Sequence, residues 1–141
     1  MKLRFKKLNE AAKAPQFAHA TDAGMDIYTI EDATIAPGER QFLKTGIALA
    51  VPHGYAALVW DKSGVAAKRG LKTLAGVIDA DYRGEVMIGL HNLTNEAQSF
   101  AAGDKIAQIL IQKVEQPTIE VVDELDDTER GAGAFGSTGA Q

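Results

Sequence analysis

The sequence predicts an all-β domain, a sandwich or jelly roll with one short helix. Two observations lead to this prediction: apolar residues recur with a period of two in several segments, and turn signals separate these segments at short intervals. Many short strands joined by frequent turns are typical of sandwiches and jelly rolls. A chain of 141 residues can bury one core but is too short for two separate lobes, so we expect a single domain.

The period-two alternation marks four strands in order along the chain. Their alternating apolar residues lie within 3–5, 45–51, 86–90 and 107–111. Pro37 and Gly38 occupy the positions that a type II turn prefers for these residues, and 52–54 and 102–104 supply further turn signals. These turns fit strands that reverse direction one after another.

One segment, 65–69, has a helical composition. Gly70 after it is suited to a C-cap, and Ser63 before it is a possible N-cap. The chain becomes acidic from Asp123 onwards and then Gly-rich. Because a segment of this composition cannot form a core, we expect the jelly-roll domain to span 1–125 and residues 126–141 to form a flexible tail.

Composition and charge argue against several classes of function. A formal net charge of −4 argues against stable nucleic-acid binding, since nucleic-acid-binding proteins usually present a basic face. The chain has no cysteine, and its three histidines are scattered without the spacing of metal ligands. No apolar stretch reaches the length of a signal peptide or a membrane span. We therefore expect a soluble, cytoplasmic protein that does not bind membranes.

The segment 76–86 combines two carboxylates with glycines on either side. Asp79 and Asp81 are two residues apart, which would place both on the same side of an extended strand. Gly76 and Gly84 indicate a hairpin whose backbone approaches a ligand. A carboxylate fixed by such a hairpin can accept a proton from a water that attacks phosphorus. Solvated acids on a surface hairpin are the alternative interpretation.

Three further segments carry polar groups suited to a phosphorylated ligand. Lys62 and Ser63 precede the expected helix, whose first free N–H groups attract phosphate. Asp26 follows a glycine at the start of a strand; it could hold a metal-bound water or satisfy local backbone N–H groups. Gln108 is polar within an apolar strand and needs a partner, which a phosphate oxygen or a neighbouring backbone group would supply.

The last twelve residues, 130–141, carry one guanidinium, one aromatic ring, two hydroxyls and four glycines. Glycine lets backbone N–H groups approach an anion closely, and Arg130 offers a fork of donors for phosphate oxygens. Phe135 can lie over a planar base. This composition predicts a flap that closes over a nucleotide, and a frayed polar terminus is the alternative.

Taken in order, these segments resemble the five motifs of the trimeric dUTPases. The sequence reads Ala-Gly-Met-Asp at 23–26, Lys-Ser-Gly at 62–64, Gly-Val-Ile-Asp-Ala-Asp-Tyr-Arg-Gly at 76–84, Gly-Asp-Lys-Ile-Ala-Gln at 103–108 and Arg-Gly-Ala-Gly-Ala-Phe-Gly-Ser-Thr-Gly at 130–139. The third and fifth motifs are highly specific, and the resemblance covers nearly the whole chain.

The resemblance implies a distorted jelly-roll barrel that hydrolyses dUTP to dUMP and pyrophosphate. Water would attack the α-phosphorus, with Mg²⁺ bound mainly by the triphosphate and by water. The reaction limits uracil incorporation into DNA and supplies dUMP for dTMP synthesis. The family forms homotrimers with shared active sites, in which the tail of one chain closes over a site built largely by its neighbours.

The resemblance also implies roles for individual positions. Asp79 matches the catalytic carboxylate that orients and activates the attacking water. Tyr82 matches the ring beneath the deoxyribose, where it would reject a ribose 2′-hydroxyl. Asp26 matches an outer-shell partner of the metal, acting through water. The other substrate-binding positions lie in the phosphate segment, the uracil hairpin and its returning strand, the fourth motif and the tail: Lys62, Ser63, Gly64, Gly76, Val77, Ile78, Met87, Gln108, Arg130, Phe135, Gly136, Ser137 and Thr138.

The chain departs from the family pattern at the second motif, which usually reads Arg-Ser-Gly, often after Pro. Here Lys62 supplies a point charge in place of a planar fork, and Asp61 brings a negative charge nearby. Some members carry an Asn where this chain has Thr73, so no side-chain contact with the ligand is assigned to Thr73.

Two alternative functions accompany this prediction. One is a dCTP deaminase, or a bifunctional deaminase and diphosphatase, of the same fold, although 79–84 differs from the Asp-Pro-Gly and Glu-Gly signature of those enzymes. The other is a non-catalytic trimeric jelly roll used for binding.

Overall fold

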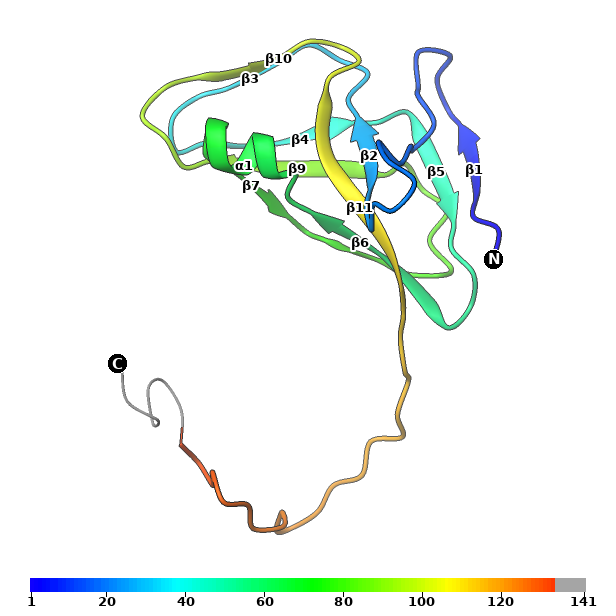
Figure 1. Cartoon of the computed structure of the whole chain (residues 1–141), viewed down its shortest axis with the longest axis vertical. Coiled ribbons are helices and arrows are strands. Elements are labelled where there is room, and N and C mark those ends of the chain that lie inside the picture. Colours follow the sequence, from blue (N-terminus) through cyan, green and yellow to red (C-terminus); the bar gives the residue numbers. More distant parts are fainter. Residues whose placement is uncertain (134–141) are drawn as a thin grey trace.

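The computed structural model describes residues 1–133, and antiparallel strands make up most of its compact body (Figure 1). Its elements in chain order are β1 (Arg4–Lys7), β2 (Met25–Tyr28), β3 (Ala33–Ile35), β4 (Arg40–Lys44), β5 (Ile47–Ala50), β6 (Tyr55–Trp60), α1 (Ser63–Arg69), β7 (Leu71–Leu74), β8 (Val77–Ile78), β9 (Met87–Asn92), β10 (Gln98–Phe100) and β11 (Lys105–Lys113). The prediction of an all-β jelly roll with one short helix is confirmed.

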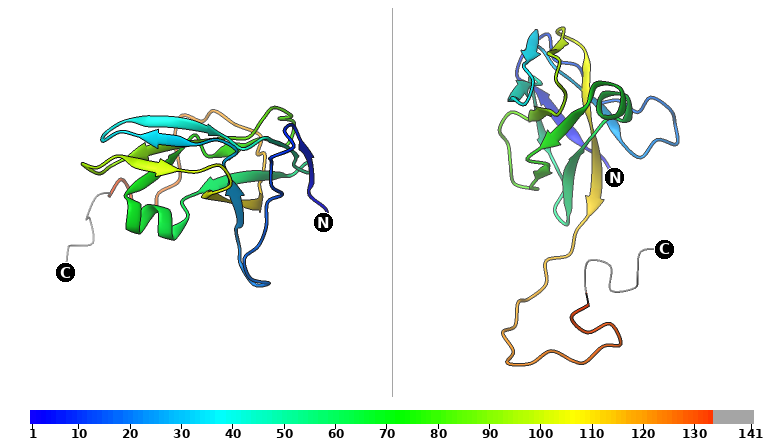
Figure 2. Two further views of the ribbon diagram at one scale, coloured as in Figure 1. Left: turned by 90° about the horizontal axis from the view of Figure 1, so that it is seen from above. Right: turned by 90° about the vertical axis from the view of Figure 1, so that its left-hand side faces the viewer.

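The strands form two larger and two smaller antiparallel sheets. The larger sheets have the orders β2-β11-β6-β8 and β4-β9-β7, and the smaller pairs are β1-β5 and β10-β3. Buried side chains from both larger sheets, such as Ile109 of β11 and Ile88 of β9, belong to one apolar core. Sheets that share a core in this way are typical of sandwiches and jelly rolls. Figure 2 shows this body from two further sides.

The four predicted strands are all present. The segments 3–5, 45–51, 86–90 and 107–111 overlap β1, β5, β9 and β11 respectively. The predicted type II turn is also present, because Glu39 N–H donates to the Ala36 carbonyl at 3.1 Å and Gly38 has a φ of 74°.

The helix α1 ends before Gly70, as predicted, but its N-cap lies one residue earlier than the predicted Ser63. Gly70 has a left-handed φ of 62°, and its N–H donates to the Ala66 carbonyl at 3.0 Å. The prediction that Ser63 is the N-cap is wrong, since the helix already includes Ser63 and Lys62 is the N-cap without a side-chain capping bond. The Lys62 side chain is engaged elsewhere, as described below.

The chain leaves the compact body after β11 (Figure 1). Ile119, Val121 and Leu125 lie on this departing segment, and each is at least 85% exposed. The predicted domain end at residue 125 therefore lies well beyond the last strand of the single chain. Among the described residues, no helix has the length and apolar character needed to cross a membrane.

Candidate active site

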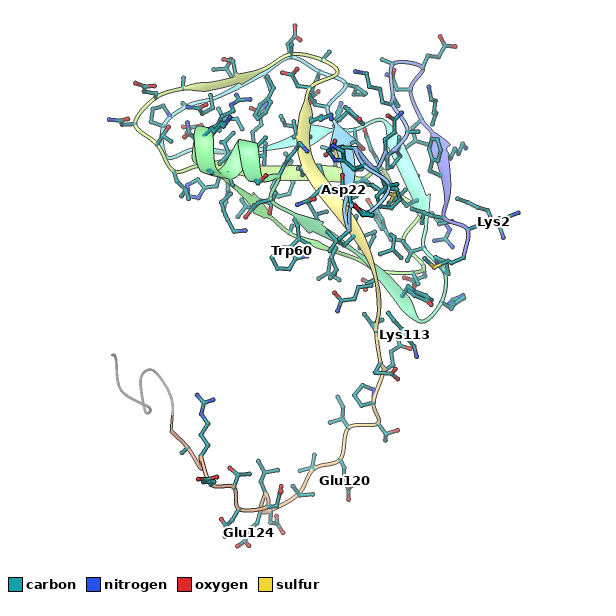
Figure 3. The ribbon with its side chains drawn as sticks, in the orientation of Figure 1. Lys2, Asp22, Trp60, Lys113, Glu120 and Glu124 are labelled. Carbon is teal, nitrogen blue, oxygen red and sulfur yellow. The ribbon has the colours of Figure 1, made fainter. Side chains whose placement is uncertain are left out.

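The sheet β2-β11-β6 brings three of the predicted site segments together. Gln108 of β11 lies opposite Asp26 of β2 and opposite Trp60 of β6. A pocket of about 450 Å³ opens beside this row, and we call it the Lys62 pocket; Figure 3 labels two of the residues at its wall, Asp22 and Trp60. Its lining consists of Asp22, Ala23, Gly24, Trp60, Asp61, Lys62, Ser63, Gln108 and Leu110.

Asp26 lies behind this pocket as a carboxylate shared between two lysines. Lys62 Nζ donates to Asp26 Oδ1 at 2.6 Å, and Lys105 Nζ lies 2.8 Å from Oδ2. Asp26 is only 3% exposed. Burial by itself raises the pKa of Asp26, but the two ammonium groups outweigh it and hold that pKa below its ordinary value. Asp26 is therefore ionised at neutral pH.

The described residues 1–133 offer no ready-made metal site, because no three His, Asp or Glu side chains gather among them. Both oxygens of Asp26 face ammonium groups, which would repel a hydrated divalent cation. The prediction that Asp26 holds a metal-bound water does not fit this arrangement. Lys62 and Lys105 come from distant parts of the chain, so the sequence showed the acid without its partners.

Gln108 finds one of the two kinds of partner that the sequence predicted. Its Nε2 donates to the Asp61 carbonyl at 2.8 Å, and the side chain is half-buried in the pocket wall. A Cβ atom added to Gly24 would collide with the Gln108 carboxamide. Glycine at this position therefore gives Gln108 its room.

Asp61 faces away from Lys62 and anchors the start of the pocket loop to β7. Its Oδ1 accepts from the Thr73 N–H at 2.8 Å and from the Thr73 hydroxyl at 2.7 Å, and its Oδ2 lies 2.6 Å from Lys72 Nζ. The unusual acid of the second motif is thus neutralised locally. Thr73, to which no ligand contact was assigned, serves as its partner.

We expect Asp61→Ala to lower the free energy of unfolding by about 1–3 kcal/mol at pH 7, because the Thr73 donors lose their acceptor. Burial raises the pKa of Asp61, but hydrogen bonds from Lys72 and Thr73 and the charge of Lys72 together lower that pKa by more than burial raises it. The net shift of the pKa is therefore downward. The contribution of Asp61 is then fully present above the ordinary carboxyl pKa of about 4 and disappears as the pH falls through the lowered value. Urea unfolding at pH 7 and pH 3 should show a smaller difference between variant and wild type at pH 3, and an equal difference would contradict this account.

A second cluster of predicted site residues surrounds the turn after β8. A pocket of about 200 Å³ lies there, and we call it the Asp79 pocket. Its lining consists of Ala75, Val77, Ile78, Asp79, Tyr82, Glu85, Val86 and Met87.

The Asp79 side chain belongs to a turn and not to an extended strand. β8 ends at Ile78, and Tyr82 N–H donates to the Asp79 carbonyl at 3.2 Å. The prediction that Asp79 and Asp81 share one side of an extended strand is therefore wrong. Asp79 and Asp81 are both exposed and both line a second pocket beside His53, but only Asp79 also lines the Asp79 pocket.

The hairpin around Tyr82 is held by its own side chains. Tyr82 Oη donates to the Glu85 carbonyl at 2.9 Å, and one Arg83 nitrogen donates to the Ala80 and Tyr82 carbonyls at 2.7 and 2.8 Å. A Cβ atom added to Gly84 would collide with the Tyr82 ring. Gly84 therefore allows the ring to fold back beside the pocket.

Gly76 lets the hairpin approach β6 closely. Val59 N–H donates to the Gly76 carbonyl at 2.7 Å, and a Cβ atom on Gly76 would lie 2.9 Å from the Val59 carbonyl oxygen. Gly64, by contrast, lies in the first turn of α1, and a Cβ atom there would meet nothing within 4 Å.

Several pocket residues carried no role in the sequence analysis. Glu85 accepts from Gly46 N–H at 2.8 Å through its carboxylate, and Ala75 turns the chain before β8 with a φ of 54°, which is uncommon for a residue with a Cβ atom. Trp60 and Lys105 were also overlooked as site residues. The available signals were the position of Lys105 inside the motif 103–108 and that of Trp60 two residues before the motif 62–64.

One chain does not bring the two pockets together. Ile78 lies opposite Ala57 on β6, and β8 is antiparallel to β6, so the chain after Ile78 runs away from Lys62. At about 3.3 Å per residue, Asp79 and Lys62 are separated by about 15–20 Å along β6. A triphosphate chain does not reach that far.

The predicted tail residues are only partly within the described structure. Arg130 is exposed, and its Nε donates to the Gly133 carbonyl at 2.9 Å. Phe135, Gly136, Ser137 and Thr138 lie outside the described residues 1–133.

Comparison with known proteins shows which family has this arrangement. A family model described as dUTPase matches residues 10–139. The chain belongs to the dUTPase family. The deoxyuridine 5′-triphosphate nucleotidohydrolase of Nautilia profundicola is 47% identical over 141 residues, which cover 99% of each chain. The predicted family is thus confirmed over most of the sequence.

Solved dUTPase structures have the same fold. A variant dUTPase of Staphylococcus bacteriophage 80alpha, solved with dUpNHpp, superposes with a TM-score of 0.93 at 30% identity, covering 99% of each chain. A variant dUTPase from phage phi11 of S. aureus superposes with a TM-score of 0.82 at 30% identity, covering 88% of this chain and 98% of the other. That structure is described as showing how a structural Mg(II) ion is coordinated.

Proposed function

We propose that this chain is a dUTP diphosphatase, which hydrolyses dUTP to dUMP and pyrophosphate in active sites shared between the chains of a homotrimer. The observation that carries the proposal is a pair of complementary pockets in a chain of the dUTPase family. The Asp79 pocket offers the carboxylate of Asp79, the ring of Tyr82 and a backbone hairpin, and the Lys62 pocket offers a cation, a hydroxyl and an amide.

The Asp79 pocket would hold the nucleoside and the attacking water. Backbone groups of 76–78 would read the uracil edge, with Met87 close to the nucleoside, and cytosine would leave buried polar groups unpaired. Tyr82, held by Glu85, would lie beneath the deoxyribose and exclude a ribose 2′-hydroxyl. Asp79 would orient the water and take its proton as the water oxygen bonds to the α-phosphorus and pyrophosphate leaves.

The Lys62 pocket would bind the phosphates. Lys62 supplies a charged donor, Ser63 and Gly64 supply donors from the first turn of α1, and the Gln108 amide faces the same pocket. Mg²⁺ would arrive with the triphosphate, and we assign it no ligand among residues 1–133.

Assembly from several chains would join the two pockets. Their separation on one chain means that the Asp79 pocket of one subunit must meet the Lys62 pocket of another. The exposed apolar side chains of the segment after β11 also need cover that the single chain does not give them. Residues 126–141 of a further subunit would then close the site, with Arg130, Gly136, Ser137 and Thr138 on the phosphates and Phe135 over the uracil.

A nucleotide panel tests this function. Wild-type protein with Mg²⁺ should release pyrophosphate from dUTP, with much lower rates for dCTP, dTTP and UTP. Ammonia release from dCTP would indicate the deaminase instead, and nucleotide binding without turnover would indicate a binding protein. The family match and the named relatives favour the diphosphatase over both alternatives.

A further inference from the structure

The shared carboxylate of Asp26 is the most unusual electrostatic feature of the described chain. Lys62 and Lys105 lie on its two oxygens, at 2.6 and 2.8 Å respectively. The Asp26 side chain is 4% exposed, whereas the two lysine side chains are 29% and 44% exposed. A buried anion thus holds two cations that both reach towards solvent.

Only one of these cations lines the Lys62 pocket. Lys62 belongs to its wall, whereas neither Asp26 nor Lys105 does. Asp26 therefore lies one layer behind the surface that would meet the phosphates, and Lys62 stands between Asp26 and the ligand.

We infer that Asp26 is a positioning residue, which acts through Lys62 and holds the lysine ammonium group in place for the phosphates of the substrate. This inference rests on the proposed function of the Lys62 pocket and replaces the metal-associated role that the sequence predicted for Asp26.

The physical reason lies in the flexibility of lysine. A lysine side chain has four rotatable bonds and no planar fork, so an unrestrained Lys62 would lose considerable entropy on binding phosphate. The short contact with Asp26 removes part of that freedom before the ligand arrives, which is how preorganisation raises affinity. Lys105 offsets the charge of Asp26, so that the cluster keeps a net positive charge towards an anion.

Two substitutions separate this role from a metal role. Asp26→Asn keeps the shape of the side chain but loses the charge that attracts both lysines, so Lys62 and Lys105 repel each other and Lys62 becomes mobile. Lys62→Met removes the ammonium group and keeps the aliphatic stem. If Asp26 acts through Lys62, the effects of the two substitutions cannot add.

The primary measurement is binding of inorganic tripolyphosphate in the presence of a chelator, followed by tryptophan fluorescence. Trp60 is the single tryptophan of the chain and lines the Lys62 pocket, so its emission reports on that pocket directly. We expect Asp26→Asn to weaken binding by about tenfold in the wild-type background, and by less than about twofold in the Lys62→Met background. Additive effects in the two backgrounds, or tighter binding in Asp26→Asn, would overturn the inference.

The dependence on Mg²⁺ supplies an independent readout. The Mg²⁺ concentration giving half-maximal dUTP turnover should be the same for wild type and Asp26→Asn, although kcat/KM falls in the variant. A higher Mg²⁺ requirement in the variant would support the metal-associated role of Asp26 and overturn our inference. Thermal unfolding checks that both variants fold, and Lys105→Met, which leaves the Lys62–Asp26 pair intact, should weaken tripolyphosphate binding less than Asp26→Asn does.

The experiment also separates this inference from the proposed function. If wild-type protein binds tripolyphosphate with the predicted coupling but does not hydrolyse dUTP, the diphosphatase proposal fails and the role of Asp26 stands. If dUTP is hydrolysed but the coupling is absent, the diphosphatase proposal stands and the role of Asp26 fails.

Discussion

Replacing Asp79 with Asn is expected to lower dUTP turnover by about 10³-fold or more while nucleotide binding is preserved, because a general base contributes up to about 10⁴-fold. Asn keeps the size and polarity of the side chain, so the turn from Asp79 to Tyr82 should stay intact. Pyrophosphate release measures the loss, and titration with a non-hydrolysable dUTP analogue measures binding.

Asp81→Asn is the matched control for this prediction. Asp81 has the same chemistry two residues away and is exposed as Asp79 is, but it is not part of the Asp79 pocket. We expect dUTP turnover by the Asp81→Asn variant to remain within about threefold of wild type, as for most surface substitutions. Equal losses in the two variants, or an active Asp79→Asn enzyme, would remove Asp79 from the proposed mechanism.

Truncation after Arg130 should be the second most damaging change, lowering kcat/KM for dUTP by at least about a hundredfold. The reason is that donors to a charged transition state are each worth about 10²–10³-fold, and removing residues 131–141 takes away Gly136, Ser137, Thr138 and the ring of Phe135 together. The compact body ends with β11, so the truncated chain should keep its fold and its oligomeric state.

Two comparisons sharpen this second prediction. Phe135→Ala alone should weaken nucleotide binding more than it affects the oligomer, because the ring would cover the base. Analytical ultracentrifugation of the truncated chain should match wild type. If turnover of the truncated chain is unchanged, the tail is a frayed terminus and the flap is refuted.

The fold was largely predictable because its signals are local. The alternation in 107–111 follows from one strand facing one core, and Gly70 and Gly38 occupy positions where only a residue without a side chain adopts a positive φ easily. The start of α1 was less predictable. Lys62 gave no capping signal because a lysine side chain has no acceptor for the free helix N–H groups, and its ammonium group instead contacts Asp26, far away in sequence.

The pairings within the site were not predictable for the same physical reason. In the sequence, the negative charge of Asp61 lies next to Lys62. In the structure, strand β7 instead brings Lys72 and Thr73 into contact with Asp61. No local sequence pattern predicts such a contact between strands. Similarly, the sequence identified Asp79 as an acid in a hairpin but not the turn that separates it from Asp81. Contacts across a sheet depend on register, which a single sequence shows poorly.

The proposed sharing of one site between chains would explain why a small chain carries so many separated motifs. β8 directs Asp79 towards the start of β6, whereas Lys62 follows its end. This separation of Asp79 from Lys62 follows from the antiparallel register of β8 and β6. No rearrangement of side chains within one chain can therefore bring the two residues together. The central claim is therefore that the Asp79 pocket and the Lys62 pocket of one working site come from different chains.

Complementation between two inactive variants tests this claim most directly. Asp79→Asn would be co-expressed with a chain carrying both Lys62→Met and Gln108→Leu, with a different affinity tag on each chain, and oligomers that retain both tags would be assayed for pyrophosphate release from dUTP. In a homotrimer that retains both tags, one of the three sites combines two intact halves, so we predict about a third of wild-type activity. Activity no higher than that of either variant alone would show that both pockets of a site belong to one chain and would contradict the account.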